Sequence, residues 1–151
     1  MQLDIVIPCF NEEAVLEEIH LRVKKILEEV KGKKLIDGYN IIFVDDGSYD
    51  GTFEILETFS KKDNSVKALS LSRNFGHQAA LSAGLNFSKG DAVISLDADL
   101  QDPPELIETM LQRFHEGFEI VYGVRNDRQE DTFFKRTSAK LFYKLMLWFG
   151  V

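Results

Sequence analysis

Two aspartates separated by one residue, Asp97 and Asp99, form the pattern in this sequence that most resembles a metal site. In extended backbone, residues i and i+2 point to the same side, so both carboxylates can face one cation, with the Gln101 carbonyl as a further oxygen ligand. Such ligands suit Mg²⁺ or Mn²⁺, and Mg²⁺ commonly completes its shell with substrate phosphates. The pattern therefore predicts a metal that holds a diphosphate. Helix capping by Asp99 or Asp102 is the competing structural explanation.

A second acidic pair, Asp45 and Asp46, is followed by Gly47 and Ser48. Asp, Gly and Ser are common in strand-to-helix turns, which would explain the run without any ligand. A carboxylate at this place could also accept hydrogen bonds from a base N–H or from ribose hydroxyls. These residues alone leave both interpretations open.

The elements that must position these side chains follow from the alternation of short apolar runs with longer amphipathic ones, which is typical of a parallel sheet flanked by helices. Strands are predicted at residues 3–8, 40–45, 66–71, 92–96 and 119–124. Helices are predicted at residues 12–30, 51–62 and 78–87 and from Pro103 onward, with Asp50 and Asp102 as capping side chains. Ligands bind at the carboxyl ends of such strands, so the acidic pairs are expected on one edge.

Composition narrows the class of protein further. The 151 residues carry a net charge of -7, which argues against a general nucleic-acid partner. A chain of this length can bury roughly 70% of its unfolded surface in one domain. Cys9, the single cysteine, excludes an internal disulfide and is expected to be a packed, inert thiol. The sequence has no run of about 20 apolar residues that would cross a membrane.

Four motifs occur in order, one after each of the first four predicted strands: IPCFNEE at 7–13, VDDGSYDGT at 44–52, SRNFGH at 72–77 and LDADLQDPP at 96–104. Together they resemble a family 2 glycosyltransferase of the GT-A fold. The resemblance implies an α/β, Rossmann-like, open and mostly parallel sheet with helices on both faces. The runs GVRNDR at 123–128 and FKRTSAKLFY at 134–143 resemble the polyprenyl-phosphate glycosyltransferases within that family, such as dolichol-phosphate mannose synthase and bactoprenol glucosyltransferase.

Site residues carry over from this resemblance. It implies catalytic roles for Asp97, Asp99, Arg125 and Arg136, with Asp97, Asp99 and Gln101 at the metal. It also implies contacts to the nucleotide sugar from Pro8, Phe10, Asn11, Glu12, Val44, Asp45, Asp46, Arg73 and Ala98. The family usually has Tyr at the position of Phe10, and Phe can stack but has no hydroxyl to donate.

The implied activity is that of an inverting, metal-dependent hexosyltransferase, which moves glucose from UDP-glucose to a polyprenyl phosphate. A phosphate monoester has a second pKa near 6, so this acceptor is already anionic at pH 7 and a general base is not required. The alternatives are a family 2 enzyme with a saccharide or other acceptor and, more remotely, a phospho-receiver domain. Mg²⁺ or Mn²⁺ is the expected cofactor, and assembly into a homo-oligomer stays open.

The two parts of the chain differ in charge. Residues 1–131 hold all 25 acidic side chains and are expected to form the catalytic domain. Residues 132–151 hold no acid and four basic side chains, Lys135, Arg136, Lys140 and Lys144. On a helical wheel, Arg136, Lys140 and Lys144 lie opposite Phe, Leu and Trp, as in a helix at a membrane surface. We expect this segment to lead into transmembrane helices, with the protein at the cytoplasmic face of the cell membrane.

Overall fold

The computed structural model describes residues 1–99, 101 and 103–124. One compact unit spans Met1–Val121, and a second comprises Tyr122–Val151. The described elements are, in chain order, Gln2–Cys9 (β1), Leu16–Gly32 (α1), Gly38–Asp45 (β2), Thr52–Lys62 (α2), Val66–Ser70 (β3), His77–Phe87 (α3), Ala92–Ser95 (β4) and Leu106–His115 (α4). The predicted amphipathic helix in 132–151, together with Arg125 and Arg136, lies outside the described residues.

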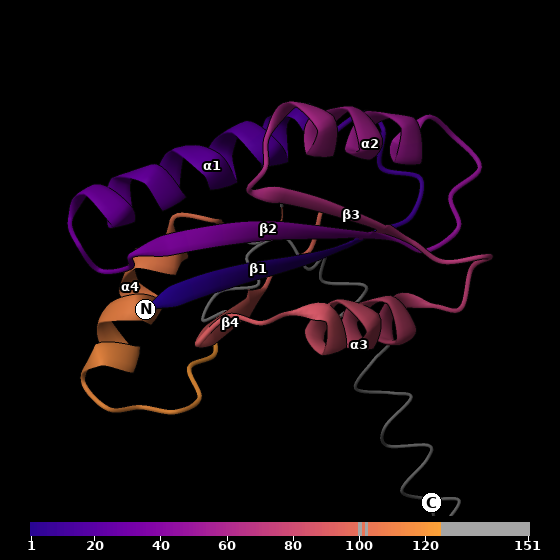
Figure 1. The fold of residues 1–151 in the computed structure, drawn as a ribbon. Helices are drawn as coiled ribbons and strands as arrows, with labels where there is room; N and C mark the ends of the chain where they lie inside the picture. The colour runs from indigo at the N-terminus through magenta and orange to yellow at the C-terminus, as the bar shows by residue number, and fades with distance from the viewer. Residues whose placement is uncertain (100, 102, 125–151) are drawn as a thin grey trace, which may run out of the picture. The chain divides into compact units, whose positions relative to one another are not determined.

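The strands form a parallel sheet in the order β3-β2-β1-β4 (Figure 1). β1 lies in the middle, with Pro8 and Cys9 beside Val44 and Asp45 of β2 and with Val6 beside Ser95 of β4. Because all four strands run the same way, their carboxyl ends meet at one edge, as the alternating pattern predicts. The predicted α/β fold with a parallel sheet is confirmed.

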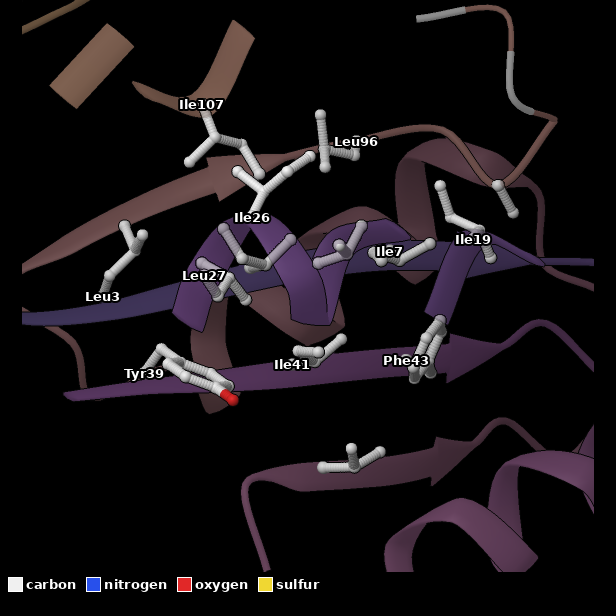
Figure 2. Close-up of a cluster of buried hydrophobic side chains, with 14 of the residues drawn as sticks. Leu3, Ile7, Ile19, Ile26, Leu27, Tyr39, Ile41, Phe43, Leu96 and Ile107 are labelled. Carbon is white, nitrogen blue, oxygen red and sulfur yellow. The ribbon is translucent and has the colours of Figure 1, made fainter. Parts of the chain in front are cut away.

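Helices cover both faces of the sheet, with α1 and α2 on one side and α3 on the other (Figure 1). On the first side, α1 places Ile26 and Leu27 over the strands, and Ile107 of α4 joins the same buried cluster (Figure 2). On the second side, Gly84 brings α3 close to the sheet: a Cβ there would lie 2.4 Å from Val6 Cγ1. Because both faces are covered at the centre of the sheet, nearly all residues of β1 and most of those of β2 are buried.

The prediction of a fifth strand at residues 119–124 is wrong. In the structure this stretch has no strand, and the alternating apolar side chains Phe118, Ile120, Tyr122 and Val124 are 56–82% exposed. Pairing with a neighbouring strand is what stabilises a strand, and none of the described strands pairs with this stretch.

Two helices begin later than predicted. α1 starts at Leu16 rather than at residue 12, although the N–H of Leu16 already donates to the carbonyl of Glu12 in the turn before it. The free N–H groups of this turn are capped from the next loop: that of Glu12 donates to Thr52 Oγ1 and that of Glu13 to Asp50 Oδ2. α4 starts at Leu106 rather than at Pro103. A residue before proline is pushed out of the helical region, so Pro103 before Pro104 cannot begin a helix. None of the described helices is long and apolar enough to span a membrane.

His20 offers a test of the packing between α1 and α2. Its ring stacks on Phe59 with 4.3 Å between centroids, and its buried Nε2 has no hydrogen-bond partner among the described residues. Burial lowers the pKa of His20, and the charge of Lys24 lowers it further. The unfolded chain therefore binds a proton more readily, so stability must fall as the pH drops below about 6.5.

We expect His20→Phe to raise the free energy of unfolding at pH 7 by about 1 kcal/mol, because an unpaired buried polar atom is removed. The variant should also lose stability less steeply than the wild type below about pH 6.5, as measured by urea unfolding across a pH series. His115→Gln, a change at an exposed histidine, is the control. An unchanged pH dependence in His20→Phe would contradict this account of the interface.

Candidate functional site

A pocket of about 260 Å³ lies at the edge of the sheet where β1, β2 and β4 end. Seven of the residues predicted to form a site line it: Pro8, Phe10, Glu12, Asp46, Asp97, Ala98 and Asp99. They come from three strand ends that are far apart in sequence, and the parallel sheet brings them together. In the described part of the chain, these strand ends therefore share one pocket, and the role of that pocket stays a prediction.

Five further predicted residues do not line this pocket, and each has another position. Val44 is fully buried in the core beneath α3. Asn11 and Asp45 make hydrogen bonds within the loops: Asn11 Oδ1 accepts from the N–H of Tyr49, and Asp45 Oδ1 accepts from the N–H of Ser48. The exposed Arg73 guanidinium stacks on the Phe75 ring, 4.4 Å from its centroid.

Gln101, the fifth of these residues, is exposed and is connected to the site through Asp99. Its N–H donates to Asp99 Oδ1 at 3.0 Å, which holds the Asp99 side chain against its own loop. The resemblance implied that the Gln101 carbonyl is a metal ligand. That role stays a prediction.

Asp46 is buried, and both of its carboxylate oxygens are occupied by backbone donors. Oδ1 accepts from the N–H of Phe75 and Oδ2 from the N–H of Gly76, each at 2.8 Å. These bonds hold the loop before α3, where Gly76 has a φ of 96°. Asp46 therefore shapes the pocket wall by fixing a loop about thirty residues away, a role that the sequence alone did not suggest.

Sequence reasoning missed part of the lining that this loop supplies. Asn74, Gly76, His77 and Ala80 line the pocket, as does the buried Cys9. His77 begins α3 and places Nε2 3.7 Å from Asp97 Oδ1. The motif SRNFGH contained the signal, but the contacts that hold the loop at this edge, such as its hydrogen bonds to Asp46, join distant parts of the chain. Burial raises the pKa of the Cys9 thiol, and the charges of Glu12 and Asp45 raise it further, in keeping with an inert thiol.

The loops after β1 and β2 are tied to each other beside the pocket. The N–H of Asn11 donates to Ser48 Oγ, and the N–H of Gly51 donates to Glu13 Oε2. Gly47 meets the third loop: its φ is 68°, and a Cβ there would lie 2.4 Å from the backbone carbon of Arg73. Only glycine fits such a conformation and such a close approach without strain. These contacts hold the loops at the pocket rim against one another.

The charges at the pocket favour a cation. Four carboxylates line it, from Glu12, Asp46, Asp97 and Asp99, and no lysine or arginine does so among the described residues. Burial raises the pKa of Glu12, and the nearby charges of Asp99 and Asp50 raise it further. In the described residues, no three acidic, histidine or cysteine side chains are close enough to hold a metal by themselves. A donor set of hard oxygens that is rich in charge fits Mg²⁺ or Mn²⁺ with ligands shared by a substrate.

This fold is the GT-A fold, which solved glycosyltransferase structures share. TarS 1-349 of S. aureus in complex with UDP matches with a TM-score of 0.57 and 20% identity over 84% of this chain and 40% of that one. The mannosyltransferase PcManGT from Pyrobaculum calidifontis, in complex with GDP-Man and Mn²⁺, matches with a TM-score of 0.54 and 20% identity, over 67% and 32%. At 20% identity, these two similarities show that the fold is shared and nothing more.

The family follows from the sequence. The family described as Glycosyl transferase family 2 matches residues 4–149, and the chain belongs to this family. The uncharacterized glycosyltransferase YkcC of Bacillus subtilis is 45% identical over 97% of this chain and 44% of its own length. The bactoprenol glucosyl transferase of Shigella phage SfX is 40% identical over 96% and 46%. The chain thus spans less than half the length of these relatives.

Proposed function

We propose that this chain is the donor-binding and catalytic part of an inverting glycosyltransferase that moves glucose from UDP-glucose to a polyprenyl phosphate. The observation that carries the proposal is the pocket at the strand ends, where Asp97 and Asp99 face the same space as Phe10 and Glu12. The similarity to the bactoprenol glucosyl transferase of phage SfX supports the acceptor and the sugar.

Asp97 and Asp99 would hold the divalent metal, with Gln101 as a further ligand. When bound, the metal supplies positive charge that stabilises the phosphate oxygens of the departing nucleoside diphosphate. The wall formed by Pro8, Phe10 and Ala98 is apolar enough to accept a nucleoside beside this charged end. Arg125 and Arg136 stay predicted partners of the phosphates.

The acceptor phosphate brings its own negative charge to the reaction. Its oxygen would attack the sugar C1 while the bond from C1 to the diphosphate oxygen breaks, and a single displacement of this kind inverts the configuration. No proton has to be removed from an acceptor that is already anionic at pH 7. The side chains of the pocket would therefore act by orienting the donor and by stabilising charge rather than by general base catalysis.

A polyprenyl phosphate is a membrane lipid, so the proposal places the chain at a membrane surface. The basic, apolar segment 132–151 supports this, because each Lys or Arg near an anionic surface contributes about 1 kcal/mol. We infer that the protein works at the cytoplasmic face of the cell membrane.

The test is transfer of radiolabelled glucose. The protein that carries this chain is incubated with labelled UDP-glucose, Mn²⁺ and a polyprenyl phosphate in detergent. We expect the label to enter an organic-solvent extract as an acid-labile lipid, and to require the polyprenyl phosphate. Label that appears instead on an added saccharide, with none in the lipid, would contradict the acceptor. The Asp99→Asn variant is the control for transfer that depends on this site.

A further inference from the structure

Tyr49 is an aromatic residue at the pocket rim to which neither the fold nor the proposed chemistry gives a role. Its side chain is 85% exposed, although it lies in the otherwise polar loop between β2 and α2. It does not line the pocket, but its ring contacts Phe10, which does. A large ring left in water beside a pocket gains free energy when a ligand covers it.

The backbone that presents this ring is fixed. The N–H of Tyr49 donates to Asn11 Oδ1 at 2.9 Å, and the N–H of Asn11 donates in turn to Ser48 Oγ at 2.9 Å. Asn11 has a φ of 56°, which turns the first loop toward the second. The backbone is therefore fixed at the rim, while most of the ring stays exposed.

The two rings meet nearly at right angles. Their centroids are 6.0 Å apart and their planes are inclined by 76°, and Phe10 is itself 37% exposed. Two rings in this arrangement form a corner, in which a flat ligand can stack on one ring and touch the other with its edge. Nucleobases are flat and stack on aromatic side chains whatever their hydrogen-bonding pattern. Tyr49 also carries a hydroxyl, which Phe10 lacks.

We propose that Tyr49 is a nucleobase-contacting residue, and that Tyr49 and Phe10 form an aromatic corner that holds the uracil of the donor. The inference rests on the proposed function, since it assumes a nucleotide in this pocket. The ring of Tyr49 makes the main contribution, through stacking or edge contact, so a phenylalanine at this position serves almost as well.

The experiment is titration with UDP in the presence of Mn²⁺. We expect Tyr49→Ala to weaken UDP binding about ten-fold, the loss of one base–aromatic contact, and Tyr49→Phe to bind within about two-fold of the wild type. Phe87→Ala is the matched control, because Phe87 is a 46% exposed aromatic at the far end of α3 and should have no effect.

A spectroscopic measurement distinguishes direct contact between Tyr49 and UDP from an indirect effect of the substitution on UDP binding. In protein with isotope-labelled tyrosine, the Tyr49 ring signals should shift on addition of UDP and not on addition of inorganic phosphate. If Tyr49→Ala bound UDP with wild-type affinity, or if the Tyr49 ring signals did not shift when UDP was added, the inference would be overturned. A different result would contradict the proposed function itself: the wild-type protein would bind no uridine nucleotide with Mn²⁺ at all.

Discussion

Replacing Asp99 with alanine is expected to abolish metal-enhanced binding of the donor. Asp99 lines the pocket with Asp97 and Glu12, and the pKa of Glu12 is raised in part by the charge of Asp99. Loss of residues that merely support metal ligands costs about 10–100-fold in metal affinity, so loss of a proposed ligand should cost about 100-fold or more. Calorimetric titration of UDP-glucose with Mn²⁺ measures the effect.

Asp99→Asn separates charge from local structure in this prediction. The amide oxygen can still accept the hydrogen bond from the N–H of Gln101, so the loop is preserved while the charge is lost. We expect this variant to lose metal-enhanced binding as well. Asp91→Ala, at the opposite end of β4, is the matched control and should bind as the wild type does. If both Asp99 variants bound UDP-glucose with Mn²⁺ as tightly as the wild type does, Asp99 would not be a metal ligand.

Asp46→Ala is expected to weaken both the fold and the binding of the donor. The buried carboxylate accepts two backbone N–H bonds at 2.8 Å, and alanine would leave the donors of Phe75 and Gly76 unpaired. Hydrogen bonds to a charged group contribute about 1.5–3 kcal/mol each, so we expect a loss of about 3 kcal/mol in the free energy of unfolding. Urea unfolding measures this loss.

The same change should release the loop that carries Asn74 and His77, and these residues line the pocket. Binding of UDP-glucose should therefore fall even under conditions where Asp46→Ala stays folded. Ser70→Ala is the control, because it removes a single exposed hydroxyl donor to the neighbouring Asp45. A folded Asp46→Ala protein with wild-type stability would show that these two bonds do not hold the loop.

The strands could be predicted because the two central ones are buried on both faces. Ile5 and Ile41 pack on the side of α1, and Val6 and Ile42 pack on the side of α3, so the apolar runs of β1 and β2 have few exposed positions. The end of β1 could not be predicted to the residue, nor could the start of α1. The segment between them is bound by Thr52, a contact across forty residues that local periodicity does not contain.

The site could be predicted as far as strand ends determine it. Asp97, Asp99 and Glu12 follow strands directly, so the topology alone brings them to one pocket. The position of a loop is a different matter, because it depends on long-range hydrogen bonds such as those that Asp46 accepts from Phe75 and Gly76. Val44 and Asp45 belong to the same motif as Asp46 but still lie in β2, where Val44 packs in the core and Asp45 accepts from the nearby N–H of Ser48.

Under the proposed function, this pocket binds a uridine diphosphate sugar through a divalent metal. Titration of the wild-type protein with UDP-glucose tests this binding, first with Mn²⁺ and then with a chelator, beside UDP-galactose, UDP-N-acetylglucosamine and GDP-mannose. We expect micromolar-to-millimolar binding of UDP-glucose with Mn²⁺, weakened by more than about ten-fold when the metal is removed. Equal affinity with and without the metal, or a preference for GDP-mannose, would contradict this expectation.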